Sequence, residues 1–160
     1  MLARLSVISQ AVRVSARPAM MLLWMASKST TADRARAVSE PGALVLLCVG
    51  AWLVPGGGHL WLGRRQKGLV FLAMISVMFV IGLWLQGAIF PFQVSEPLAG
   101  LAAIAQLGTG VPWMIARFAG AGDGVVTSAT WEYGNAFMIV AGLLNFLIIL
   151  DVYDIAMGRK

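Results

Sequence analysis

The sequence has very few charged residues, and this scarcity excludes an ordinary soluble domain. Only 12% of the 160 residues are Asp, Glu, Lys or Arg, whereas a soluble globular protein carries about 25% of them. Hydrophobic residues make up 59% of the chain, and the mean hydropathy is +0.83. Because so much apolar surface needs lipid or other membrane proteins to cover it, the composition predicts an integral membrane protein.

Residues that bind metals or carry redox chemistry are equally scarce. The chain has one cysteine, Cys48, and one histidine, His59. This excludes an internal disulfide and makes structural zinc, iron–sulfur clusters and covalently attached c-type haem improbable. The sequence also has no Ser/His/Asp set and no aromatic–basic pattern of a nucleic-acid module. We therefore expect neither an enzyme nor a nucleic-acid partner.

Long apolar runs dominate what is present. They cover Gly42–Leu62, Gly68–Gln86, Leu98–Ile115 and Asn135–Tyr153. The last three approach the ~20 apolar residues that a helix needs to cross a bilayer. The first run is interrupted by Pro55, which leaves a helix of only about 20 Å before the break. The runs predict an all-α, polytopic integral membrane protein with three or four transmembrane helices, near 42–62, 68–86, 98–115 and 135–153.

Residues 1–40 differ from the transmembrane domain predicted over 41–160. Leu5, Ile8 and Val12 form a weak apolar stripe, whereas Arg13 and Arg17 lie where a signal peptide needs its apolar region. We therefore expect a basic amphipathic segment on the cytoplasmic leaflet, in contact with anionic headgroups. This segment holds half of the basic residues of the chain, namely Arg4, Arg13, Arg17, Lys28, Arg34 and Arg36.

The distribution of basic residues leaves two placements open for the first apolar run. If all four runs cross the membrane, eight basic residues lie on one side and four on the other. If the first run is re-entrant, the division is ten against two, which agrees better with the positive-inside rule. However, irregular backbone at membrane depth is tolerated only where protein or a water-filled cavity covers it. Four spans, with the N-terminus in the cytoplasm, is the arrangement that we expect.

The strongest local pattern is a proline–glycine turn followed by a basic cluster. Proline and consecutive glycines break a helix, Trp61 suits the headgroup layer, and the basic side chains face phosphates. The pattern predicts a tight turn between two membrane helices, and a phosphate-binding loop of the Walker type is absent. The motif consists of Pro55, Gly56, Gly58, His59, Trp61, Gly63, Arg64, Arg65, Lys67 and Gly68.

This turn resembles that of the two-transmembrane-helix (TM-two) domain family, whose pattern is P-G-x-G-x-x-Y-L-G-R-x-x-x-G. The end of the chain, Asn145–Lys160, resembles the C-terminus of uncharacterised bacterial membrane proteins that contain such a turn. The resemblance implies a helix–turn–helix unit in a bacterial cytoplasmic (inner) membrane, and it implies no particular chemistry. The matching residues are Pro55, Gly56, Gly58, Leu62, Gly63, Arg64 and Gly68, and Trp61 replaces the usual tyrosine.

Four polar residues inside or beside the apolar runs are candidates for function. His59 is a possible axial ligand of haem iron or chlorophyll magnesium, or else a structural residue bonded to a carbonyl or a headgroup. Asp151 and Asp154 lie on one helix face, where they would form a proton or cation site or pair with Arg159, Lys160 or a partner subunit. Asn145, near the middle of the last helix, is a candidate donor of an interhelical hydrogen bond.

These observations favour a non-catalytic accessory or scaffolding subunit of a larger bacterial membrane complex, surrounded by lipids and other integral membrane subunits. The first alternative is a pigment- or haem-binding subunit that uses His59. The second is a small transporter or ion-coupling protein that uses Asp151 and Asp154.

Overall fold

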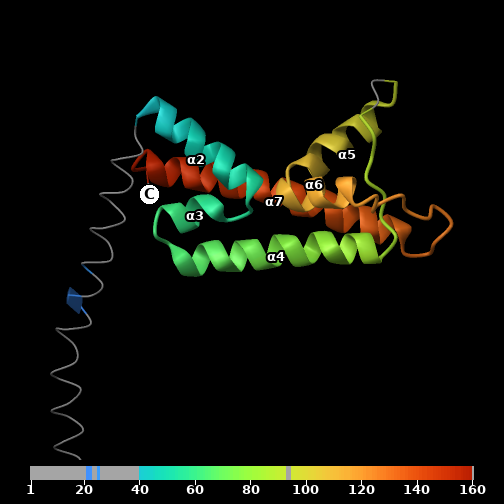
Figure 1. Ribbon diagram of the computed structural model, residues 1–160, viewed down its shortest axis with the longest axis horizontal. Coiled ribbons are helices and arrows are strands. Elements are labelled where there is room, and N and C mark those ends of the chain that lie inside the picture. Colours follow the sequence, from blue (N-terminus) through green and yellow to red (C-terminus); the bar gives the residue numbers. More distant parts are fainter. Residues whose placement is uncertain (1–20, 23–24, 26–39, 93–94, 160) are drawn as a thin grey trace, which may run out of the picture.

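The computed structural model describes residues 21, 22, 25, 40–92 and 95–159. Over these ranges the chain forms helices without strands, which confirms the all-α prediction (Figure 1). The predicted amphipathic segment 1–40 lies almost entirely outside the described residues. The helices are α2 (Pro41–Leu53), α3 (Gly57–Trp61), α4 (Arg65–Trp84), α5 (Pro97–Leu107), α6 (Val111–Phe118) and α7 (Trp131–Ala156).

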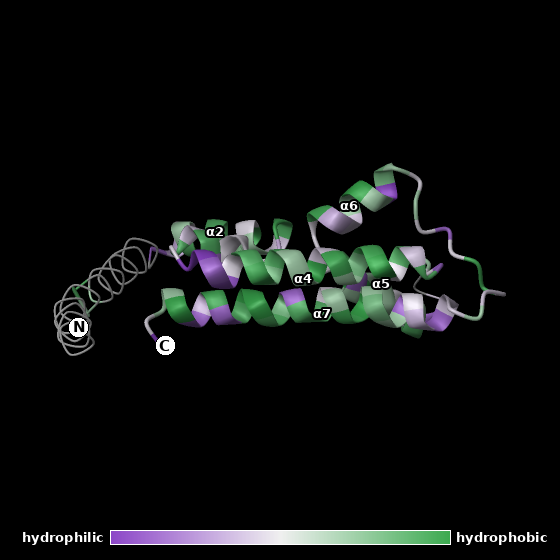
Figure 2. Ribbon diagram, turned by 90° about the horizontal axis from the view of Figure 1, so that it is seen from below, coloured by the Kyte–Doolittle hydropathy of each residue, from purple (hydrophilic) through white to green (hydrophobic). Residues whose placement is uncertain are grey.

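Two long helices, α4 and α7, form the framework of the fold. They contain 20 and 26 residues, enough at about 1.5 Å per residue to cross a hydrocarbon layer of about 30 Å. The two helices run side by side in opposite directions (Figures 1 and 2). They approach closely because Gly82 leaves room for Met138 and for the backbone of Gly134. Both helices qualify as membrane spans by length and apolarity.

We call the end of the α4–α7 pair where α4 begins and α7 ends the first end. The opposite end, near Trp84 and Trp131, is the second end. Each end supports one shorter helix pair. The α2–α3 pair packs near the first end, where Leu47 and Ala51 join Val152 in a buried apolar cluster. The α5–α6 pair packs near the second end.

The expected span over residues 42–62 is not formed. Helix α2 finishes at Leu53, and α3 turns back towards the first end, where α4 begins (Figure 1). Pro55 has no backbone N–H to continue a helix, and Gly56 adopts a φ of 75° that favours glycine. The segment therefore enters and leaves the bundle at one end, as a re-entrant hairpin does.

The expected continuous helix over residues 98–115 is also broken. Helices α5 and α6 meet at an angle of 111°, because Gly110 has a φ of 69° and leads directly into α6. The chain after α6 returns to the second end, where the Ile89 N–H donates to the carbonyl of Gly122 over 2.7 Å. The described residues thus contain two candidate spans, or three if the bent α5–α6 pair counts as one.

The two ends differ in charge. Arg64, Arg65 and Lys67 lie at the first end, and Arg159 follows α7 there. The basic segment 1–40 precedes α2, which also begins at that end. Arg117, near the end of α6, is the single basic residue among those described near the second end. Most of the described basic residues therefore lie at the first end.

We predict that both hairpins are re-entrant, so that the chain crosses the membrane twice. In a Cys48→Ala background, Glu40→Cys and Gln66→Cys should be labelled from the cytoplasmic side, and Ser95→Cys and Thr127→Cys from the opposite side. The measurement is labelling of intact cells and inverted vesicles with a membrane-impermeant maleimide. A four-span chain would instead place the members of each pair on opposite sides.

Candidate functional site

Most of the buried polar side chains in the described ranges lie on α7 or contact it. Five polar residues have less than a tenth of their surface exposed. Four of them fall into three clusters along this helix, and the fifth, Thr109, donates to the carbonyl of Gln106 over 2.6 Å. The residues are His59, Gln106, Thr109, Asn135 and Asn145. Because a polar group is costly to bury in an apolar environment without a partner, the partners of these five show what holds the fold together.

The first cluster joins α3 to α7. The Nε2 atom of His59 lies 3.0 Å from Oδ2 of Asp151. His59 is fully buried, whereas the Asp151 side chain is 28% exposed. The ring of His59 packs edge-on against Phe71 at a centroid distance of 5.1 Å, and its Nδ1 atom is buried without a hydrogen-bond partner. The structure thus brings together two residues that the sequence analysis considered separately.

The glycines of the turn allow α3 to pack between its neighbours. A Cβ atom on Gly58 would lie 2.7 Å from a methyl group of Val152 and 2.9 Å from Cβ of Ala51. A Cβ atom on Gly56 would collide with the carbonyl oxygen of Gly68. The faces of these glycines are therefore filled by the protein itself.

The two aspartates of α7 have different partners. Asp154 pairs with Arg159 through Oδ1 and Nη1 at 3.5 Å, and both side chains are partly exposed. Asp151 contacts His59, so the two carboxylates bond to different neighbours. Lys160, the other cation expected there, lies outside the described residues.

The second cluster lies near the middle of α7. Asn145 is fully buried, and its Nδ2 donates to the carbonyl of Trp52 over 3.2 Å and to that of Gly108 over 2.8 Å. These carbonyls belong to the tips of the two hairpins. The Trp52 indole also donates to the carbonyl of Leu107 over 3.1 Å. The interhelical hydrogen bond expected of Asn145 is therefore present, and it reaches both hairpins at once.

The third cluster holds the loop after α4 near the second end. Oδ1 of Asn135 accepts a hydrogen bond from the Ala88 N–H over 2.7 Å. Gln106 accepts from the Phe90 N–H over 3.0 Å and donates to the carbonyl of Ala88 over 2.9 Å. The sequence analysis missed both residues, although each stands out as a polar side chain in an apolar helix.

The basic cluster of the motif lies at the start of α4. This helix has no side-chain cap and no acidic residue in its first turn, and neither Arg64, Arg65 nor Lys67 forms an ion pair with a described residue. Trp61, just before the cluster, is 58% exposed. A basic surface beside an exposed tryptophan is typical of a membrane–water interface.

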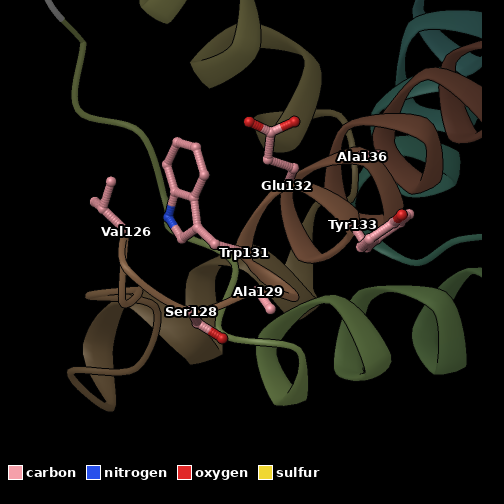
Figure 3. A pocket seen from close by; sticks show the side chains of 7 residues that line it. All are labelled: Val126, Ser128, Ala129, Trp131, Glu132, Tyr133 and Ala136. Carbon is pink, nitrogen blue, oxygen red and sulfur yellow. The ribbon is translucent and has the colours of Figure 1, made fainter.

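A cavity of about 660 Å³ lies at the start of α7 (Figure 3). Glu132 provides its one carboxylate, while Trp131 packs edge-on near Phe90 at a centroid distance of 6.4 Å. The described residues contain no group of three or more His, Cys, Asp or Glu side chains that could hold a metal ion. The lining residues are Val126, Ser128, Ala129, Trp131, Glu132, Tyr133 and Ala136.

A family model described as a family of unknown function (DUF6677) matches residues 46–160. The match begins within α2 and includes both hairpins and both long helices. No curated protein and no solved structure matches the chain.

We predict that His59 and Asp151 stabilise the fold as a pair. A double-mutant cycle of His59→Ala and Asp151→Ala should give a coupling energy of about 0.5–2 kcal/mol, because either single change removes the contact between the two side chains. The measurement is unfolding of the purified protein in detergent. The control is Asp154→Ala, whose exposed pair should contribute little. A coupling energy of zero would show that the contact is energetically neutral.

Proposed function

We propose that this chain, which belongs to the family of unknown function DUF6677, is a non-catalytic accessory or scaffolding subunit of a larger bacterial membrane complex. One observation carries the proposal. The buried polar side chains bond to the protein's own framework: His59 to Asp151, Asn145 to the hairpin tips, and Gln106 to the loop after α4. Hydrogen bonds of this kind stabilise the fold, and they support a structural role for these side chains.

The surface left for interaction is apolar. Helix α4 has a buried face and an exposed face. Ile75 and Phe79 are 1% exposed and pack against α7, whereas the outer face is open. A face of this kind suits either lipid or the helices of another integral membrane subunit. The outer face consists of Leu69, Val70, Met74, Val77 and Val80, each between 54% and 60% exposed.

The proposed location is the bacterial cytoplasmic membrane, with the first end in the cytoplasm. The concentration of basic residues at that end supports this orientation. The resemblance of residues 55–68 to the TM-two turn supports the bacterial assignment. In this arrangement the basic cluster at the start of α4 faces anionic lipid headgroups.

Neither alternative has gained support. The pigment or haem hypothesis relied on open glycine faces beside His59, and protein atoms fill those faces. The transporter hypothesis relied on Asp151 and Asp154 acting together, and they contact His59 and Arg159 respectively.

We predict that the outer apolar face contacts another protein in native membranes. A photo-crosslinking amino acid at Val77 on α4, or at the exposed Leu147 on α7, should give a discrete adduct with a different protein. The same amino acid at Thr127, in the loop before α7, is the control and should give none. The measurement is mass spectrometry of the adducts.

Two outcomes would contradict the proposal. Adducts with lipid alone at both positions, together with a homogeneous monomer in mild detergent, would indicate a protein that acts by itself. Adducts with a second copy of the same chain alone would indicate a homo-oligomer.

A further inference from the structure

Three basic residues lie at the amino-terminal end of α4, where a helix already carries partial positive charge. Arg64 immediately precedes the helix, and Arg65 and Lys67 lie in its first turn. Because the first N–H groups of a helix have no partner within it, cations are unfavourable at this position and anions are favourable. The first turn has no acidic residue, and no side chain caps it. An anion from outside the helix would therefore stabilise this end of α4.

The two aspartates of α7 at the first end bond to other residues. Asp151 contacts His59 at 3.0 Å, and Asp154 contacts Arg159 at 3.5 Å. Arg65 and Lys67 are both exposed, so their charges can be reached from outside the protein. The basic cluster of Arg64, Arg65 and Lys67 is thus accessible to an external anion.

The turn before α4 holds the backbone of this cluster in place. The Arg64 N–H donates to the carbonyl of His59 over 2.8 Å, and Leu62 is fully buried. A Cβ atom on Gly68 would lie 2.6 Å from Cδ2 of Leu60, so α4 starts in close contact with α3. Because the backbone is already ordered, binding of an anion here costs little in chain entropy.

An exposed apolar surface continues directly from the basic cluster (Figure 2). Lys67, Val70 and Met74 are spaced three and four residues apart, so they lie on one face of α4. Val70 and Met74 are 54% and 58% exposed. They lie about 5 and 11 Å beyond Lys67 along the helix axis, within the depth of one leaflet, about 15 Å. A positive site above an apolar surface of this depth matches an anionic phospholipid.

We propose that the start of α4 binds one anionic phospholipid from the leaflet at the first end. Arg64 and Lys67, three residues apart, bind the phosphate, and the acyl chains lie on Val70 and Met74. A lipid with a net negative headgroup fits this site, whereas the trimethylammonium group of phosphatidylcholine is repelled by the cluster. The inference rests on the membrane location proposed above and requires no partner subunit.

The test is native mass spectrometry of the purified full-length protein in detergent, with phosphatidylglycerol or phosphatidylcholine added. We expect one phosphatidylglycerol to remain bound per chain at concentrations where phosphatidylcholine does not. Lys67→Gln should raise the apparent Kd for phosphatidylglycerol about fivefold, the effect of one cation beside anionic lipid. The matched control is Arg117→Gln, which removes one cation near the second end and should leave this Kd unchanged. Both side chains are exposed, so both variants should fold.

Three results would overturn the proposal. Equal retention of the two lipids would show that the headgroup charge is not recognised. Equal changes of Kd in Lys67→Gln and Arg117→Gln would place the lipid away from the start of α4. Displacement of the lipid by an equal concentration of inorganic phosphate would indicate a site for phosphate alone. Because no partner protein is present, the result is independent of the crosslinking that tests the role as a subunit.

Discussion

The amide of Asn145 is the contact on which the arrangement of this fold depends. A short helix that stops inside a membrane leaves carbonyl groups that water cannot reach, and each must find a partner within the protein. One Asn145 side chain provides that partner for the tips of both hairpins. The other polar clusters fix the hairpins at their sides, through His59 and Asp151 for the first and Gln106 for the second. The fold is therefore two long helices with two hairpins anchored on α7.

Close packing makes this arrangement possible without a large core. A Cβ on Gly142 would collide with the carbonyl of Ala105, so glycine is needed for α5 to lie on α7. The same requirement explains Gly58 against Val152 on the other hairpin. Because apolar side chains gain little by leaving lipid for each other, such backbone contacts and hydrogen bonds hold membrane helices together. The outer faces of the helices remain apolar.

The sequence predicts the long helices well and the hairpins poorly. The predicted spans 68–86 and 135–153 correspond to Arg65–Trp84 and Trp131–Ala156, because an uninterrupted apolar run of that length has few alternatives. Hydropathy does not report the direction of the chain after a break. The re-entrant course of the first run was therefore only an alternative, and the turn after Leu107 was missed. His59 and Asp151 are 92 residues apart, and no local pattern connects them. Asn145 was predicted as a donor, but its acceptors are backbone carbonyls that carry no sequence signal.

Hydrogen–deuterium exchange of the Asn145→Ala variant tests the central claim most directly. If one side chain holds both hairpins, exchange should rise together in peptides covering residues 50–58 and 106–112, relative to the unmodified protein. Peptides from the middle of α4 serve as the internal reference and should remain protected. If exchange rises in only one hairpin, or in neither, this would contradict the claim that Asn145 holds both hairpins.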